Sequence, residues 1–450
     1  MTPSAHRHVL VGGRPRLLLG GGQLHNSTSS DLDRARAAFD RVVAMGGNAV
    51  TTTVSWHLVE PVEGSYDFSG VDPLVDMARE RGLALTLLWF GAFKNAASTY
   101  APRWVRADAE RFPRADLGGA GGAGARPGAR GTAGRLWRER GRRACGTWAE
   151  VFGEDEWAQE VFMAWGFASY CGALAAAGAR HLDVLFHVNA WLGPQPGQDL
   201  PGRYPSGGPV AGVVDVWKAA APALALLGPD IYVDDVKAAV AGYVREDNAL
   251  LVPESRPAAG NLLWAVGRGA IGFNVFGVDD VRADGRLAAA YRLLAGAEEV
   301  IIAAQRSGRI RPVLLEAGQT AVVGLTWTLC GSGEVLRSMF LDAGVQVRTE
   351  AGAGEPETTD EALVAAPADT RATAVLVDLG DDELLAIGQR LMFEVAGAPG
   401  EVVEIDDAVE ARYEAGAWVS GRNLNGDERL NLLPLDRPAA VRIRVLRRRA

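Results

Sequence analysis

Three consecutive stretches decide the fold: NAVTTTVSW at 48–56, VDPLVDMARERG at 71–82 and LALTLLWFGAF at 83–93. The first is rich in β-branched residues, which favour strands. The second has apolar residues at helical spacing and ends at a glycine. The third is apolar nearly throughout, as expected for a strand whose two faces are both covered. A strand, a helix and a strand in this order predict a parallel α/β unit.

The same alternation continues on both sides. Further strands are predicted at 16–21, 181–191, 230–236, 248–254 and 270–277, and further helices at 31–45, 156–178, 213–228 and 286–305. Ser30 with Asp33 is expected to cap the first helix, and Pro222 to interrupt or kink the helix at 213–228. Polar residues cluster just past the strand ends, which fits a (β/α)8 TIM barrel better than an open doubly wound sheet. The count is seven strands, so one βα unit is missing from the prediction.

The pattern changes near residue 313. Short alternating runs such as QTAVVGLTW, ATAVLVDLG and VRIRVLRRR are separated by glycine and acidic turns. This predicts an all-β domain, with a sandwich as its expected form. The expected domains are therefore a barrel over 1–312, interrupted by a Gly/Ala-rich segment at 118–134, and a β-domain over 313–450.

Bulk properties limit the partners. The chain of 450 residues has a formal net charge of −9, which argues against nucleic acid and anionic membrane as partners. Its three cysteines show no metal-ligand spacing and indicate a reduced compartment. No signal peptide and no run of about 18 apolar residues is seen, so no spanning helix is expected. The expected location is the cytoplasm, and a homo-oligomer is possible.

One segment is specific enough to suggest a family. Residues 56–68 follow the pattern W-x-x-x-E-P-x-x-G-x-Y-D-F, and they come with GGQLHNS at 21–27, HVNAWLG at 187–193, YPSGGPV at 204–210 and VPESR at 252–256. This set resembles glycoside hydrolase family 35, in the bacterial branch whose members carry an uncharacterised C-terminal β-domain. The resemblance implies a retaining β-galactosidase that acts on a small β-galactoside or oligosaccharide, and it implies no cofactor or metal.

Retaining hydrolysis uses two carboxylates about 5–5.5 Å apart, one as nucleophile and one as acid/base. By the resemblance, Glu254 is the nucleophile. A buried carboxylate needs a hydrogen-bond partner to stay ionised. Tyr232 and Arg256 are the candidates, and the resemblance supports Tyr232.

The acid/base residue is not found in the sequence. In the family it follows the fourth strand in a Gln-Val-Glu-Asn-Glu-like motif, and no such motif occurs here. The corresponding place holds GGAGGAGARPGARGTAG at 118–134. Three interpretations stay open: a linker that replaces a lost βα unit, an excursion into another reading frame of GC-rich DNA, or a surface loop with the acid supplied from elsewhere. The carboxylates weighed as substitutes are Glu60, Glu139, Glu150, Asp234 and Asp235.

Other residues are expected to contact substrate. By the resemblance, Gln23, His25 and Asn26 line the sugar pocket, and Trp56 and Glu60 belong to the second-strand motif, where Glu60 contacts a sugar hydroxyl. Further candidates are an aromatic platform of Trp89, Trp191 and Phe276 and the hydroxyl partners Asn95, Asn189 and Asp279. His57 and His187 are interpreted as structural, since no metal spacing surrounds them.

The sequence thus predicts a β-galactosidase that works by double displacement through a glycosyl ester on Glu254. Because the acid/base motif is missing, two rivals are kept. One is a pseudo-glycosidase that binds glycans without hydrolysing them. The other is an eroded or frame-shifted gene product.

Overall fold

The computed structural model describes residues 8–91, 99–113, 146–316, 319–324, 328–332, 371–414 and 417–450. Packing divides the chain into two compact units. Unit 1 contains Met1–Val54, Phe68–Leu88 and Ser255–Ala450, and unit 2 contains Ser55–Asp67 and Trp89–Glu254. The domain boundary expected near residue 312 stays a prediction, because unit 1 includes strands from both expected domains.

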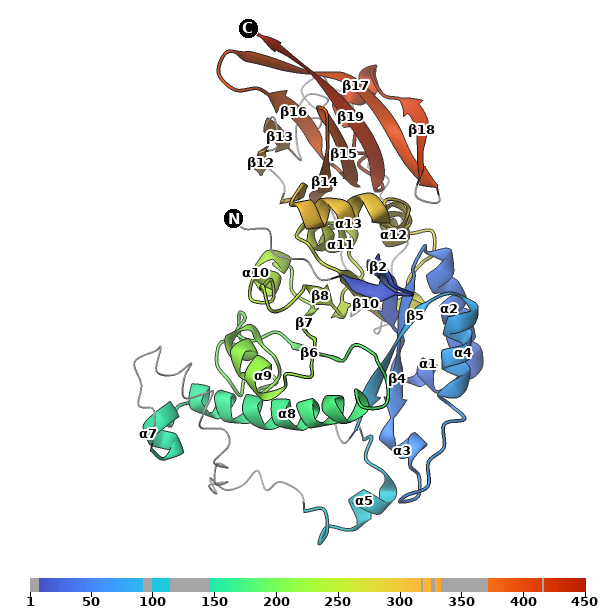
Figure 1. Cartoon of the computed structure of the whole chain (residues 1–450), viewed down its shortest axis with the longest axis vertical. Helices are drawn as coiled ribbons and strands as arrows, with labels where there is room; N and C mark the ends of the chain where they lie inside the picture. The colour runs from blue at the N-terminus through green and yellow to red at the C-terminus, as the bar shows by residue number, and fades with distance from the viewer. Residues whose placement is uncertain are drawn as a thin grey trace. The chain divides into compact units, whose positions relative to one another are not determined.

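The first unit contains a sheet in which the strands lie in the order β5 (Ala84–Phe90), β4 (Ala49–Ser55), β3 (Leu18–Gln23) and β10 (Gly272–Phe276). β3 pairs in parallel with both β4 and β10. The parallel α/β arrangement predicted from the sequence is therefore confirmed for this part of the chain. α2 (Leu32–Ala44) and α4 (Asp72–Glu80) follow β3 and β4 and contact each other (Figure 1).

The start of α2 differs from the prediction. Its N-cap is Asp31, whose carboxylate accepts hydrogen bonds from the backbone N–H groups of Asp33 and Arg34, so the expected Ser30 cap was wrong. The Ser30 hydroxyl donates instead to the Ser27 carbonyl. A carboxylate has the stronger interaction with the positive end of the helix dipole.

The glycines after α2 are required by close packing. A Cβ on Gly47 would lie 2.7 Å from the Gly20 carbonyl oxygen of β3, and a Cβ on Gly20 would lie 2.6 Å from the Gly47 Cα. Gly20 also has a φ of +71°, a conformation that glycine adopts without strain. These residues bring the turn after α2 directly against β3.

Two helices replace the single one predicted at 286–305. They are α12 (Arg286–Gly296) and α13 (Glu298–Ser307), separated at Ala297. α11 (Ala259–Gly267), which the sequence interpretation did not include, is buried along its whole length. α11 and α12 contact strands of the C-terminal sheet, and this contact joins the two parts of unit 1 (Figure 1).

The C-terminal region is built of antiparallel strands, as predicted. A six-stranded sheet has the order β11-β14-β15-β19-β17-β18, and a three-stranded sheet has the order β12-β13-β16. Their bounds are β11 Ile310–Leu315, β12 Thr320–Gly324, β13 Thr328–Ser332, β14 Ala372–Gly380, β15 Glu383–Gln389, β16 Met392–Ala396, β17 Glu401–Glu414, β18 Ala417–Asn423 and β19 Ala439–Arg449. One core that includes Val323, Leu376 and Ile443 takes side chains from both sheets.

The second unit carries the sheet β6-β7-β9, with β6 (His187–Trp191) parallel to β7 (Leu226–Ile231). The strand predicted at 230–236 was placed too late. The preceding helix, α9 (Val214–Ala220), ends before Pro222, because proline has no N–H and cannot continue a helix. The chain therefore turns early, and β7 begins at Leu226.

The remaining elements are short, apart from α8 (Glu156–Gly178), whose bounds match the predicted helix. They are β1 Val9–Val11, β2 Arg14–Arg16, α1 Asn26–Ser29, α3 Trp56–Val59, α5 Arg103–Ala107, α7 Trp148–Phe152, α10 Val236–Ala241, β8 Leu251–Val252 and β9 Glu254–Ser255.

α8 is the one helix of the described residues that is long and apolar enough to cross a membrane, and 28% of its most apolar window is buried. A single helix of this kind is weak evidence, because core helices share these properties. The expectation that no helix spans a membrane stays a prediction.

β5 and β6 are the end strands of their sheets among the residues that the structure describes. Leu87 and Trp89, two positions apart on β5, are 45% and 46% exposed. A missing fourth strand would leave two parallel edges open in this way.

Candidate functional site

The predicted nucleophile lies in the second unit. Glu254 is the first residue of β9 and is 7% exposed. Tyr232 follows β7 directly, and its hydroxyl donates a hydrogen bond to Glu254 Oε1 at 2.5 Å. Bonds of about 2.5–2.7 Å are typical of a hydroxyl that donates to a charged oxygen. The structure therefore brings together the two residues for which the sequence predicted a partnership.

An aromatic ring supports this pair. The indole of Trp191, the last residue of β6, stacks on the Tyr232 ring with centroids 5.6 Å apart and an interplanar angle of 14°. The Trp191 Nε1–H donates to Gln198 Oε1 at 3.2 Å. The Trp191 indole thus covers one face of the Tyr232 ring, and Trp191 is itself held by its hydrogen bond to Gln198.

Asn189 also lies on β6, and its Nδ2 donates to Asp230 Oδ1 of β7 at 2.7 Å. Its amide is therefore oriented by a carboxylate that the sequence interpretation did not single out. The signal was available, because Asp230 belongs to a strand that ends at the predicted site.

The Trp56–Glu60 motif forms a compact cluster. Glu60 Oε2 accepts from Trp56 Nε1 at 2.7 Å, and Glu60 Oε1 accepts from the backbone N–H of Gly64 at 2.8 Å. Trp104 adds a bond from its Nε1 to the Glu60 carbonyl oxygen and packs edge-on against Trp56. Both carboxylate oxygens of Glu60 therefore accept hydrogen bonds from its own loop, which accounts for the burial of a carboxylate that is 9% exposed.

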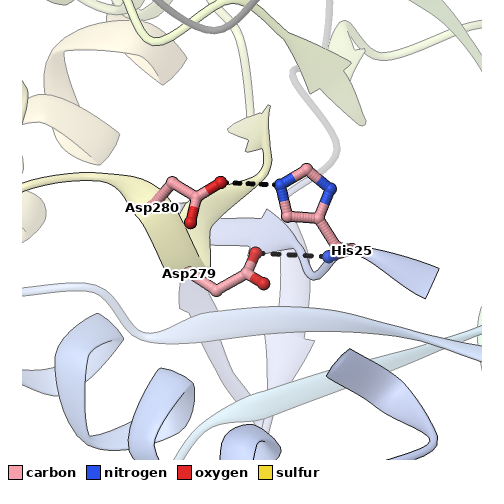
Figure 2. Close-up of side chains that lie close together, drawn as sticks. All are labelled: His25, Asp279 and Asp280. Atoms are coloured by element: carbon pink, nitrogen blue, oxygen red, sulfur yellow. Dashed lines mark hydrogen bonds and ion pairs between the residues drawn. The ribbon is translucent and has the colours of Figure 1, made fainter. Parts of the chain in front are cut away.

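A second cluster lies in the first unit, where β3 and β10 end (Figure 2). His25 Nε2 and Asp280 Oδ2 are 2.8 Å apart, and Asp279 Oδ1 accepts from the backbone N–H of His25 at 3.2 Å. Asp279 Oδ2 accepts from the Thr28 hydroxyl at 2.6 Å. The Phe276 ring meets the His25 ring edge-on at 5.0 Å.

The side chains of His25, Asp279 and Asp280 could hold a cation, since one ligand atom from each lies within 4.8 Å of the others. However, both carboxylate oxygens of Asp279 already accept hydrogen bonds from α1 and the residue before it. We therefore interpret this cluster as one that fixes the end of β3 to the segment after β10.

The binding roles of the other predicted residues stay predictions. Gln23 is the last residue of β3, Asn26 the first of α1, and Trp89 lies on β5. Arg256 follows β9, and its carbonyl accepts from the Ser255 hydroxyl. Asn95 lies outside the described residues. The three-ring platform stays a prediction.

Of the substitute acids besides Glu60, two have structural roles. Glu150 forms a capping box with Thr147 at the start of α7, and Asp235 caps α10 by accepting from the backbone N–H of Ala238. Asp234 precedes that cap, and Glu60 is bound as described above. Glu139 and the glycine run at 118–134 lie outside the described residues.

His187, on β6, is held neutral. Burial lowers the pKa of its imidazole to about 4, and its Nδ1 has no hydrogen-bond partner among the described residues. The structural role expected for His187 stays a prediction.

Two parts of the chain match known families. Residues 8–111, which include β3, β4 and the Trp56–Glu60 motif, match the family described as "Glycosyl hydrolases family 35". Residues 287–434 match the "Domain of unknown function (DUF5597)". The resemblance predicted from the sequence, a family 35 glycosidase with an uncharacterised C-terminal domain, is therefore confirmed over these residues.

Solved structures of low identity also resemble the chain. The exo-β-1,4-mannosidase Op5Man5 from Opitutaceae bacterium strain TAV5 is 16% identical, with a TM-score of 0.35 over 60% of this chain and 53% of that one. The β-amylase catalytic domain from Paenibacillus polymyxa is 12% identical, with a TM-score of 0.37 over 60% and 95% of the two chains. The β-1,4-D-mannanase from Cryptopygus antarcticus is 14% identical, with a TM-score of 0.35 over 63% and 92%.

This chain thus spans about half the length of the mannosidase. Likenesses this distant assign no substrate. A comparison with curated proteins found no match.

Proposed function

We propose that this protein is a retaining glycoside hydrolase that removes β-linked galactose through a glycosyl ester on Glu254. The observation that carries the proposal is the hydrogen bond from Tyr232 to a buried glutamate that begins a strand. The family match over 8–111 supports a glycosidase. Galactose as the sugar, the TIM barrel and the β-sandwich are parts of this proposal that rest on the sequence resemblance.

The chemistry assigns each group a step. A carboxylate oxygen of Glu254 attacks the anomeric carbon, the bond to the leaving oxygen breaks, and that oxygen departs with the electron pair. The Tyr232 O–H holds the carboxylate at one oxygen, which leaves the other for attack. Water then cleaves the ester and releases galactose with the original anomeric configuration. The substrate would be a small β-galactoside or oligosaccharide in the cytoplasm.

No general acid is assigned from the described residues. Loss of general acid catalysis typically costs 10²- to 10⁴-fold in rate, but less when the leaving group departs without a proton. A dinitrophenolate leaves in this way. Dinitrophenyl β-galactoside therefore tests the nucleophile separately from the missing acid.

The experiment measures dinitrophenol release by the wild-type chain and by Glu254→Ala. Release that falls to background in Glu254→Ala supports the proposal. Equal release by both proteins, or none from a folded wild-type chain, contradicts it.

The second candidate is a glycan-binding protein without hydrolysis, and the absence of a Gln-Val-Glu-Asn-Glu-like motif from the whole sequence favours it. This candidate predicts saturable binding of galactose-containing oligosaccharides, measured by calorimetry, with no release of dinitrophenol. The third, an eroded gene product, predicts a chain that fails to fold in either assay.

A further inference from the structure

A buried carboxyl on α8 takes no part in the proposed chemistry. The buried face of this helix consists of small or apolar residues apart from Glu160, which is 1% exposed. Burial of an ionisable group is unfavourable unless it has hydrogen-bond partners. The contacts of Glu160 therefore indicate what it holds in place.

Those contacts go to the loop 204–210, which carries the sequence YPSGGPV. Glu160 Oε2 accepts from the backbone N–H of Gly207 at 3.1 Å, and Glu160 Oε1 has no hydrogen-bond partner among the described residues. Tyr204, which is 3% exposed, lies close enough for the Glu160 charge to affect its hydroxyl. The carboxyl thus fastens this loop to α8 at Gly207.

The loop in turn lies against β6 and the residues after it. A Cβ on Gly208 would lie 2.8 Å from the Ala190 Cβ, and a Cβ on Gly193 would lie 3.1 Å from the Val210 Cβ. The loop therefore makes close contact on both sides of Trp191 in the sequence. A loop that moved away from α8 would remove this support from the end of β6.

From there the contacts lead to the nucleophile. Trp191 stacks on Tyr232, and Tyr232 donates to Glu254. Every residue in this series belongs to the second unit. Sub-ångström shifts of a supporting loop are enough to displace a group from its productive geometry.

We propose that Glu160 is a positioning residue, which fastens the loop 204–210 to α8 and so holds Trp191 against the tyrosine that orients Glu254. The effect on catalysis rests on the proposed function. The effect on the loop and on β6 does not, and the two are measured separately.

Three variants and a control test the proposal. Glu160→Ala removes the acceptor oxygen. Glu160→Asp shortens the side chain by one methylene and so moves the acceptor away from Gly207. Glu160→Gln keeps an acceptor oxygen on a side chain of the same length. Gln159→Ala truncates the exposed neighbouring side chain on the same helix and serves as the control. If Glu160→Ala does not fold, Glu160→Asp carries the test.

The first readout is amide hydrogen exchange of peptides that cover 204–210 and 187–193. We expect exchange in both to accelerate at least about tenfold in Glu160→Ala or Glu160→Asp, and to stay within about threefold of wild type in Glu160→Gln and Gln159→Ala. Acceleration that is confined to 204–210, or Glu160→Gln behaving like Glu160→Ala, would overturn the proposal.

The second readout is dinitrophenol release. We expect kcat to fall about tenfold in Glu160→Asp and KM to change less, with recovery in Glu160→Gln. An unchanged kcat in a variant whose 187–193 peptide exchanges faster would overturn the link to catalysis. If the wild-type chain releases no dinitrophenol, the proposed function fails, and the exchange data alone decide whether Glu160 positions β6.

Discussion

The Tyr232 hydroxyl lies 2.5 Å from Glu254 Oε1, so the residue after β7 donates a hydrogen bond to the residue that begins β9. Twenty-two positions separate them in the sequence. β7 and β9 are neighbours in the sheet β6-β7-β9, so the residue that follows β7 can reach the first residue of β9. This hydrogen bond is the observation that supports Glu254 as the nucleophile.

Tyr232→Phe keeps the ring that stacks on Trp191 and removes the hydroxyl. A hydrogen bond to a charged group is worth about 1.5–3 kcal/mol, so we expect kcat/KM for dinitrophenyl β-galactoside to fall by about 10- to 150-fold. Tyr243→Phe is the matched control, because the buried Tyr243 hydroxyl has no partner among the described residues. Equal losses in both variants would show that the Tyr232 hydroxyl has no special role.

Gly207→Ala should destabilise the protein more than Gly202→Ala. Both glycines have φ near +85°, so both substitutions carry a similar backbone strain. A Cβ on Gly207 would lie 2.7 Å from the Phe167 ring and 2.8 Å from the Met163 Cβ, whereas nothing lies within 4 Å of one on Gly202. Overpacking costs about 1–3 kcal/mol, and we expect this difference in the free energy of unfolding in urea. Equal stabilities would contradict the packing of the loop against α8.

The stability of the wild-type chain relative to Glu160→Gln should depend on pH. Burial raises the pKa of the Glu160 carboxyl above its ordinary value of 4.5. The folded state therefore favours the protonated form. This contribution is fully present below the unfolded pKa and is lost as pH rises through the folded pKa.

Urea unfolding of both proteins from about pH 4 to 8 measures this difference. We expect the wild-type chain to lose stability relative to Glu160→Gln as pH increases. A difference that stays constant, or that changes in the opposite direction, would refute the prediction.

His187 should make the stability of the folded protein decrease as pH falls, which is opposite to the effect of Glu160. Burial lowers its pKa from 6.5 to about 4, so the folded state favours the neutral ring. The neutral ring contributes of order 1–3 kcal/mol to the free energy of unfolding above pH 6.5, and this contribution is lost as pH falls through about 4. Comparison with His187→Asn, which does not titrate, isolates it. Parallel pH profiles of unfolding for the two proteins would show that burial does not hold His187 neutral.

Much of the α/β region could be predicted from the sequence, because its elements are long and strongly periodic. α8 was predicted at its observed bounds, and β4 and β5 lie within the predicted strands. The errors came from local competition at element ends. The N-cap of α2 is the Asp31 carboxylate and not the Ser30 hydroxyl. α9 ends before Pro222, so β7 begins earlier in the sequence than predicted.

Part of the site was also predictable. Tyr232 and Arg256 were the candidate partners of Glu254, and the family resemblance favoured Tyr232. Asp280 was missed because its importance arises from His25 on another element, whose proximity is tertiary. Asp230, the partner of Asn189, could have been found from its place on a strand that ends at the predicted site. The Glu160 contact with Gly207 joins residues 47 positions apart and likewise has no local signal.

The most direct test of the central claim is to trap the glycosyl ester. A deoxyfluoro β-galactosyl fluoride reacts readily in the first step and slowly in the second, so the ester accumulates. After incubation, proteolysis and mass spectrometry, the account predicts one added fluorosugar on the carboxyl of Glu254, and none in Glu254→Gln. A sugar attached to a different residue, or a folded wild-type chain that stays unlabelled, would contradict it.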